Sequence, residues 1–371
     1  MALAWLAGIL SVLMGSCPND PSDVLFGQYD GNAPGATIAV VRDGAIIYER
    51  SFGIANLDTG EKASSQTNYR LASITKTFTG MAIHMLAEKK LLSIGDPVTR
   101  FLPELNEVAP KVTLKHLLMH TSGLPEYEKL LPQSDPKAPL KQIVDRDVLA
   151  MIKSQKPITE PGKRYRYNNT GYALLALVIE RVSKLSYAEF LHRNIFTPVG
   201  MASSLVYAKD AKIPNRALGY SATDLRFTNT DQDRTTAVLG DGGVYSSAKD
   251  LALWIDALDH HKLIDAKRLA EATSAQVRTD TPGLSYGLGW RVGEERGERV
   301  AFHTGTTSGF KNVLLWVPSR RLGVIVLTNR RQGDPLWLGW LLLQRFWDPV
   351  QSAVPMPTIA PTPVLPTPIL P

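Results

Sequence analysis

The chain has 371 residues, 44% of them hydrophobic and 20% charged, which is typical of a soluble globular protein of one large domain or two lobes. The formal net charge of +6 is spread along the sequence, and no basic block is interleaved with aromatic residues, which argues against nucleic-acid binding. The single cysteine excludes an internal disulfide. No His-Glu-x-x-His array occurs, so we expect neither a metal site nor a cofactor.

The first elements in chain order concern targeting. Residues 1–17 are an apolar run ending in small residues, too short for a comfortable membrane span. The run resembles the core of a secretory signal, although no lysine or arginine precedes it, and Leu13–Cys17 resembles a bacterial lipoprotein cleavage site. We therefore expect export to a periplasmic or extracytoplasmic location, with lipid attachment at Cys17 as a further hypothesis. A short N-terminal anchor and a wrongly assigned start codon are the alternatives.

Residues 22–348 show the pattern of one domain with two lobes. A β-hairpin is predicted over residues 36–56, with its turn at Arg42–Gly44. Residues 91–258 alternate short helices with Pro- and Gly-rich loops, which predicts an inserted helical lobe. The helices expected there are Leu114–His120, Asp147–Ser154, Gly171–Ser183, Tyr187–Ile195 and Ala248–Leu258.

The C-terminal part returns to strands. Antiparallel strands are expected at Gly287–Glu294, Arg299–His303, Lys311–Pro318 and Leu322–Asn329, followed by an apolar helix at Trp337–Trp347 that covers one sheet face. The predicted fold class is therefore α/β (α+β), with an α/β lobe at about 34–90 and 259–348 and a helical lobe at about 91–258. The Pro-rich tail, 349–371, is expected to be disordered.

The segment Leu71–Gly80 is the strongest candidate for chemistry. Ser73 lies at or near the start of an amphipathic helix, and Lys76, three residues on, shares its face. A serine hydroxyl needs a base beside it, and a lysine amine can be that base when its surroundings lower its pKa. Free N–H groups and the helix dipole favour developing negative charge. On this pattern alone, a nucleophile and an ordinary N-cap are equally good interpretations of Ser73.

The same spacing recurs elsewhere in weaker contexts. The pairs Ser134/Lys137, Ser246/Lys249 and Ser308/Lys311 lie in a loop, at a helix N-cap and in a turn. Only Ser73 opens a long amphipathic helix, so we place the candidate nucleophile there.

Two further constellations carry candidate site residues. Tyr167-x-Asn169 combines a phenol that can transfer a proton with an amide that can bind a substrate carbonyl and orient Lys76. His303-x-Gly305 lies on a late strand, where glycine permits close approach and the Thr306 N–H can donate to an oxyanion. Taken singly, each is better interpreted as a packed aromatic, a cap residue or a strand end.

Together, Ser73-x-x-Lys76, Tyr167-x-Asn169 and His303-x-Gly305 resemble the serine β-lactamase and DD-peptidase superfamily, nearest to its class C β-lactamase-like branch of DD-carboxypeptidases, D-aminopeptidases and esterases. His116–Leu124, Gly240–Ser247 and Tyr286–Trp290 also look like family segments, and the resemblance covers about residues 34–346. It implies a two-lobed fold with the site between sheet and helical lobe.

The resemblance also implies residue roles. Ser73 would form an acyl-enzyme, while Lys76 and Tyr167 would share the proton transfers. The N–H groups of Ser73 and Thr306 would form the oxyanion hole, and Asn169 would hold the acyl amide. The partner would be a small-molecule or peptide substrate, such as a cell-wall peptide or an ester.

The chain departs from the family pattern at His303, where many family β-lactamases have lysine. A histidine is mostly neutral near pH 7, so carboxylate recognition is expected to be weaker or pH-dependent, unless Lys311 substitutes. This change favours peptidase, amidase or esterase activity over an efficient β-lactamase. A second departure is the N-terminal helix, for which only Pro21–Asp30 is available.

Three functions compete. The leading one is an exported serine hydrolase acting on D-amino-acid peptides, amides or small esters. The alternatives are a class C-like β-lactamase and a non-catalytic penicillin-binding or sensing module. A fourth signal, Gly283-x-Ser285-x-Gly287, matches the nucleophile elbow of α/β-hydrolases, but it lacks a preceding strand and a following helix, and we reject it.

Overall fold

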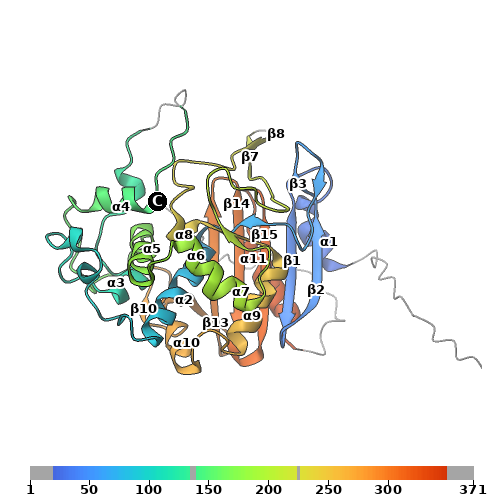
Figure 1. Ribbon diagram of the computed structural model, residues 1–371. Coiled ribbons are helices and arrows are strands. Elements are labelled where there is room, and N and C mark those ends of the chain that lie inside the picture. Colours follow the sequence, from blue (N-terminus) through green and yellow to red (C-terminus); the bar gives the residue numbers. More distant parts are fainter. Residues whose placement is uncertain (1–19, 134–138, 224–225, 349–371) are drawn as a thin grey trace, which may run out of the picture.

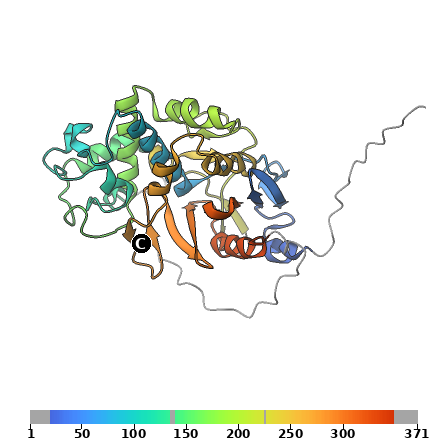
Figure 2. The ribbon, with the colours of Figure 1, turned by 90° about the horizontal axis from the view of Figure 1, so that it is seen from below.

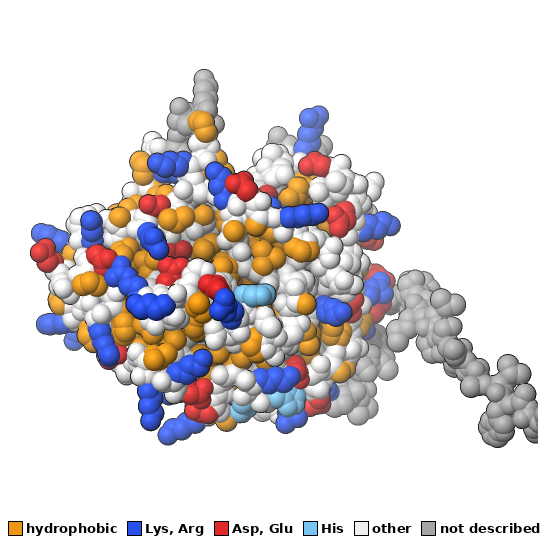
Figure 3. Space-filling view, in the orientation of Figure 1, with side chains coloured by type: hydrophobic (Ala, Val, Ile, Leu, Met, Phe, Trp, Pro, Cys, Tyr) orange, Lys and Arg blue, Asp and Glu red, His pale blue; other side chains and the backbone are white. Residues whose placement is uncertain are grey.

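The computed structural model describes residues 20–133, 139–223 and 226–348. The signal-like segment 1–17 with Cys17, and the Pro-rich tail 349–371, lie outside these ranges. Within them, no helix has the length and apolar character needed to cross a membrane. On the face shown in Figure 3, basic and acidic side chains are interspersed and no single basic patch stands out.

The fold is built on one eight-stranded antiparallel sheet with the order β10-β11-β12-β13-β14-β15-β1-β2 (Figure 1). The N-terminal hairpin joins the C-terminal strands because β1 pairs with β15 along its whole length, as the sequence suggested. The strands are β1 (Ala36–Arg42), β2 (Ala45–Phe52), β10 (Val277–Arg278), β11 (Ser285–Tyr286), β12 (Arg291–Glu295), β13 (Glu298–Thr307), β14 (Phe310–Val317) and β15 (Leu322–Thr328).

Helices cover both faces of this sheet (Figure 2). On one face, α1 (Pro21–Phe26) and α11 (Pro335–Arg345) pack on alternate strand residues such as Ile38 and Val40. On the other face, α2 (Thr75–Glu88) and α9 (Ala248–Asp259) pack on the intervening residues, such as Ala39 and Val41. Burial on both sides explains why the central strands are continuously apolar.

Most of the remaining helices pack on one another, and three of them, α5, α6 and α8, contact α2. The longest of them, α5, packs against α2 and α8. The helices are α3 (Leu114–Leu118), α4 (Asp145–Ile152), α5 (Asn169–Ser183), α6 (Tyr187–Leu191), α7 (Thr197–Val199), α8 (Leu239–Gly242) and α10 (Ala266–Ala272). Three small sheets complete the fold: β3 (Ile54–Asn56) with β4 (Glu61–Lys62), β5 (Tyr69–Arg70) with β9 (Val244–Ser246) and β6 (Leu205–Val206), and β7 (Tyr220–Thr223) with β8 (Arg226–Asn229).

Two expected boundaries differ from the structure. The strand predicted at Gly287–Glu294 is wrong in its first half, because the chain turns between β11 and β12 and the Gly287 N–H donates to the Trp290 carbonyl at 2.7 Å. Gly289 adopts φ of 104° in this turn, a conformation that favours glycine. Helix α9 was expected in the helical lobe, but it packs on β1 and β15 of the sheet. It therefore belongs to the α/β lobe, whose second segment begins before residue 259.

One histidine pair has the His-x-x-x-His spacing, but its rings serve different purposes. His116 Nδ1 accepts a hydrogen bond from the Thr113 N–H and caps α3, whereas His120 Nδ1 lies 3.0 Å from the Asn168 nitrogen. Among the described residues, no group of three or more possible ligands surrounds a metal-sized space.

Strand β13 comes into close contact with the turn before α2 at Gly305. A Cβ atom at Gly305 would lie 2.0 Å from the Leu71 carbonyl oxygen. We predict that Gly305→Ala lowers the free energy of unfolding by about 1–3 kcal/mol, because the backbone must move apart. Urea denaturation measures this change. The control is Gly293→Ala, whose Cβ would meet Phe302 at an ordinary 3.5 Å; equal losses in both variants would contradict the prediction.

Candidate active site

Ser73 lies in a single 3-10 turn, Ala72–Ile74, directly before α2. Ala72 adopts φ of 50°, in the left-handed region that alanine rarely occupies. The turn is held in place because the Leu71 N–H donates to the Val244 carbonyl at 2.8 Å. Strain of this kind persists only where the surroundings impose it, and it often marks functional sites. Here Ser73 is half-buried, whereas α2, which follows the turn, is buried along most of its length.

Lys76 is fully buried and points at Ser73. Its Nζ lies 3.0 Å from Ser73 Oγ and 2.8 Å from the carbonyl oxygen of Asp241 on α8. The rings of Tyr167 and Tyr172 lie 5.1 and 5.4 Å from Nζ, which places the amine against two aromatic faces. The Ser-Lys pair predicted from the sequence is therefore within hydrogen-bond distance.

Tyr167 and Asn169 are positioned by the start of α5. The side chain of Asn168 caps this helix by accepting from the Gly171 N–H at 3.0 Å, which fixes the residues on either side of it. The Tyr167 ring packs against His120 at 4.3 Å between centroids. Among the described contacts, the Tyr167 hydroxyl hydrogen-bonds to neither Ser73 nor Lys76. Tyr167 thus contacts Lys76 through its ring face.

Asn169 faces two glutamates rather than Lys76. Its N–H donates to Glu126 Oε2 at 2.6 Å and its Nδ2 donates to Glu128 Oε1 at 3.1 Å. The expectation that Asn169 orients Lys76 is therefore wrong, since the carbonyl of Asp241 does so. The Oδ1 atom of Asn169 is buried and has no protein partner among the described residues.

His303 forms part of the wall behind the site. It is fully buried; its Nδ1 lies 2.7 Å from the Thr304 carbonyl oxygen and its Nε2 lies 3.0 Å from the Tyr286 hydroxyl. A carbonyl oxygen only accepts, so Nδ1–H donates and Nε2 accepts from Tyr286. Burial, together with the cations Arg291 and Lys76, lowers the pKa of His303 well below its usual value. The expected pH-dependent recognition of carboxylates by His303 does not fit a buried, neutral ring.

Lys311 does not replace the missing lysine, because its Nζ donates to the carbonyl of Gly333 at 3.1 Å. The cation beside the site is instead Arg291, on β12. Its guanidinium carbon lies 5.3 Å from the centroid of the Tyr167 ring, and its Nε atom is buried and has no protein partner among the described residues. Sequence reasoning missed Arg291; its one signal was its position directly after the family segment that ends at Trp290.

Thr306 lies on the free edge of β13. Pairing of β12 with β13 ends at Arg291 and Phe302, so the following residues of β13 pair only with β14. Thr307 and Phe310 pair with each other and close a two-residue hairpin turn. Along an antiparallel strand, successive N–H groups point alternately toward and away from the paired strand, so the N–H of Thr306 points away from β14. The N–H of Thr306 is thus not used in pairing with β14, and the preceding residue, Gly305, lies against the turn that carries Ser73.

Carboxyl groups collect beside Asn169 and Lys76. Burial, with the charges of Glu128 and Asp241, raises the pKa of Glu126 to about 8. Burial also raises the pKa of Asp241, which accepts a hydrogen bond from the Tyr127 hydroxyl at 3.0 Å, to about 6. From this cluster a cleft of about 890 Å³ continues along the tip of the β13–β14 hairpin, lined by Glu128, Lys141, Asp233, Arg234, Thr306, Ser308 and Arg331 among others.

Ser285 lies apart from this arrangement. It belongs to the two-residue strand β11, which pairs with β10 and β12, and no helix follows it directly. The nucleophile elbow that its sequence imitates is therefore not formed.

Comparison with known proteins agrees with the geometry. Residues 22–343 match the family model described as Beta-lactamase. The chain belongs to the beta-lactamase family. Members of this family are serine hydrolases, and the superfamily assigned from the three motifs is thereby confirmed.

Individual relatives carry penicillin-binding names. The chain is 32% identical to Penicillin-binding protein 4* of Bacillus subtilis (strain 168), over 80% of this chain and 68% of the relative. It is 28% identical to Protein flp of Staphylococcus aureus (strain COL), over 81% of this chain and 60% of the relative. The chain thus spans only about two thirds of the length of these relatives.

Solved structures give the same fold. They include the octameric penicillin-binding protein homologue from Pyrococcus abyssi (27% identity, TM-score 0.74, covering 84% of this chain and 72% of that one). A penicillin binding protein from Bacillus halodurans is similar (28%, 0.73, covering 84% and 95%). A D-stereospecific amidohydrolase from Streptomyces sp. (23%, 0.72, covering 85% and 94%) shares the fold.

The raised pKa of Glu126 predicts a pH-dependent cost to stability. The folded state keeps this proton up to about pH 8, whereas the unfolded state releases it near 4.5, so stability falls as pH rises between these values. We predict that Glu126→Gln stabilises the protein, relative to the wild type, more at about pH 8.5 than at about pH 5.5. The measured quantity is the free energy of unfolding of the variant minus that of the wild type, from urea denaturation at each pH. This difference in the free energy of unfolding should change by at most about 1.4 kcal/mol per pH unit.

The control for this prediction is Glu298→Gln. Hydrogen bonds from Ser319 and Arg320 lower the pKa of Glu298, so this carboxyl is ionised in both states over the same pH range. Its effect on stability should be constant with pH. If the effect of Glu126→Gln on stability were equally constant with pH, the raised pKa of Glu126 in the folded state would be contradicted.

Proposed function

We propose that the protein hydrolyses amide or ester bonds through an acyl-enzyme on Ser73, with a D-amino-acid peptidase, DD-carboxypeptidase-like or esterase activity. The observation that carries this proposal is the position of the buried Lys76 amine, 3.0 Å from Ser73 Oγ and oriented by the carbonyl of Asp241. A hydroxyl beside a buried base, on a strained turn, is the arrangement that an activated serine requires.

The reaction would begin when Ser73 Oγ attacks the substrate carbonyl carbon and its proton passes to the amine of Lys76. The N–H groups of Ser73 and Thr306 would bind the negative charge that develops on the carbonyl oxygen. Breaking the bond to the leaving group would form the ester on Ser73, and the leaving amine or alkoxide would take the proton, with Tyr167 sharing the transfer. Water would then attack the acyl carbon and regenerate the Ser73 hydroxyl.

The acyl half of the substrate would lie beside Asn169, whose free Oδ1 can accept from an amide N–H. The leaving half would lie beside Tyr167, where the Arg291 guanidinium offers a charge-assisted contact to a carboxylate. A peptide ending in a free carboxylate suits this arrangement. The penicillin-binding names of the relatives agree with such a substrate. Export of the protein, with attachment through Cys17, is part of the same proposal.

Ser73→Ala is predicted to reduce hydrolysis of an activated p-nitrophenyl ester by about a thousandfold or more, because the nucleophile is lost. Ser285→Ala should leave the rate within about twofold. Steady-state kinetics on the purified protein measures both. Loss of activity only in the Ser285 variant would contradict the assignment. In the same assay, nitrocefin turnover equal to ester turnover would favour the β-lactamase alternative, and a stable penicillin adduct without turnover would favour the sensing module.

Arg291→Gln is predicted to lower kcat/KM for D-alanyl-D-alanine peptides by about 10- to 100-fold, because a charge-assisted contact to their carboxylate is lost. Neutral p-nitrophenyl esters make no such contact, so their kcat/KM should change by less than about threefold. The matched control is Lys311→Gln on β14, where the Lys311 cation donates to the carbonyl of Gly333. An equal loss for peptides and esters would show that Arg291 does not recognise the carboxylate.

A further inference from the structure

The two N–H groups of the proposed oxyanion hole come from segments that are far apart along the chain, so other contacts must fix their relative position. Ser73 lies at the start of α2, whereas Thr306 lies beside the tip of the β13–β14 hairpin. Pairing with β12 ends at Phe302, and pairing of β14 with β15 begins at Lys311. The tip at 307–310 therefore extends beyond β12 and β15, and strand β7 contacts it where the Tyr220 N–H donates to the Gly309 carbonyl at 3.3 Å. Other contacts must hold it relative to Ser73.

Strand β7 and the segment between β7 and α8 supply these contacts. The carbonyl oxygen of Ser308 accepts hydrogen bonds from the hydroxyls of Ser221 and Thr230, each at 2.8 Å. The Ser308 hydroxyl donates to Asp233 Oδ2. The hairpin tip is thus bound at both its backbone and its side chain, and Asp233 is the carboxylate that binds the side chain.

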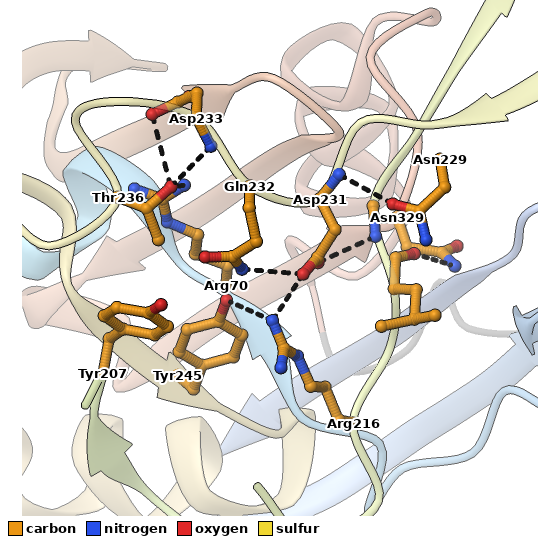
Figure 4. A network of polar contacts seen from close by, with 12 residues as sticks. Arg70, Tyr207, Arg216, Asn229, Asp231, Gln232, Asp233, Thr236, Tyr245 and Asn329 are labelled. Carbon is orange, nitrogen blue, oxygen red and sulfur yellow. Dashed lines mark hydrogen bonds and ion pairs between the residues drawn. The ribbon is translucent and has the colours of Figure 1, made fainter. Parts of the chain in front are cut away.

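Asp233 is itself fixed on the side away from the hairpin. Its Oδ1 accepts from the N–H and the hydroxyl of Thr235, each at 2.8 Å, and its own N–H donates to Thr236 Oγ1 at 2.9 Å. The same Thr236 oxygen accepts from Arg70 Nη1 at 3.1 Å (Figure 4). Burial opposes ionisation of Asp233, but the Arg70 charge and these hydrogen bonds outweigh it and lower its pKa.

Arg70 completes the connection to the nucleophile. It is buried in β5, three residues before Ser73, and its carbonyl oxygen accepts from Asn312 Nδ2 on β14 at 2.8 Å. A continuous series of contacts therefore runs from the Ser73 turn through Arg70, Thr236 and Asp233 to Ser308, two residues beyond Thr306. We call this series the Arg70–Ser308 strut.

We propose that Asp233 is a positioning residue for catalysis, which sets the separation of the Ser73 and Thr306 N–H groups through the Arg70–Ser308 strut. This inference rests on the proposed acyl-enzyme function. The donors of an oxyanion hole act only when they are fixed at hydrogen-bond distance from the developing charge, and a displacement near 1 Å can cost about 100-fold in rate. Asp233 also lines the cleft, so a direct contact to substrate is the competing role.

The two roles are separated by Asp233→Asn and Ser308→Ala, singly and combined, measured on a p-nitrophenyl ester. A positioning role predicts a fall in kcat of about 10- to 100-fold in each single variant, with KM changed by less than about threefold. The double variant should lose no more than the more impaired single variant, because both break one strut. Affinity for a phenylboronic acid, whose Ser73 adduct places an oxygen in the oxyanion hole, should fall in parallel with kcat.

Asp250→Asn is the matched control. Asp250 accepts hydrogen bonds from Ser203 and Ser204 at 2.7–2.9 Å and is not bonded to the hairpin or to Arg70 among the described residues. It should lower the unfolding temperature without lowering kcat at a temperature where the protein stays folded.

Several outcomes would overturn the inference. These are unchanged kcat in the two single variants, a rise in KM alone, multiplicative losses in the double variant, or an Asp250→Asn loss as large as theirs. A wild type that is neither acylated nor active would overturn the proposed function itself, whereas an active wild type with fully active variants would overturn only the positioning role.

Discussion

The arrangement of the candidate site depends on one hydrogen bond, between the Lys76 amine and the Ser73 hydroxyl. A fully buried amine is costly unless polar partners surround it, and Lys76 has two at hydrogen-bond distance, Ser73 Oγ and the carbonyl of Asp241. Each partner comes from a different element, the turn before α2 and the short helix α8. The position of the amine therefore depends on the packing of both lobes around α2, with the rings of Tyr167 and Tyr172 closing the other sides.

The same packing explains why the site is formed where sheet and helices meet. Helix α2 is buried along nearly its full length, between the sheet and the helical lobe. At its start, Gly305 allows β13 to approach the backbone of Leu71, which brings the free strand edge next to Ser73. The catalytic candidates thus lie on rigid elements, and loops such as residues 229–236 serve to hold them.

The sequence was sufficient for features that depend on local patterns. Strands buried on both faces give continuous apolar runs, and a serine and lysine three residues apart on a helix share a face whatever the tertiary context. The helix predicted at Gly171–Ser183 is α5, which begins two residues earlier, at Asn169. These features gave the elements of the fold, whereas the grouping of the three motifs in one site rested on the resemblance to the superfamily.

The sequence did not predict features that depend on neighbours distant along the chain. Nothing near His303 indicates that Tyr286 covers it, or that the cation beside Tyr167 is Arg291 and not Lys311. The helix α9 has an apolar face that fits either lobe, and only tertiary packing assigns it to the sheet. The strut through Asp233 joins three segments that are distant along the chain, and its aspartate, threonine and serine are common in loops, so no spacing could have marked it.

The central claim is that a covalent acyl group forms on Ser73. It is tested most directly by quenching the protein during turnover, or after exposure to penicillin, and locating the adduct by tandem mass spectrometry of its peptides. The account predicts an acyl mass on the peptide that contains Ser73, at the Ser73 position itself. An adduct on another residue, or substrate consumption with every serine unmodified, would contradict it.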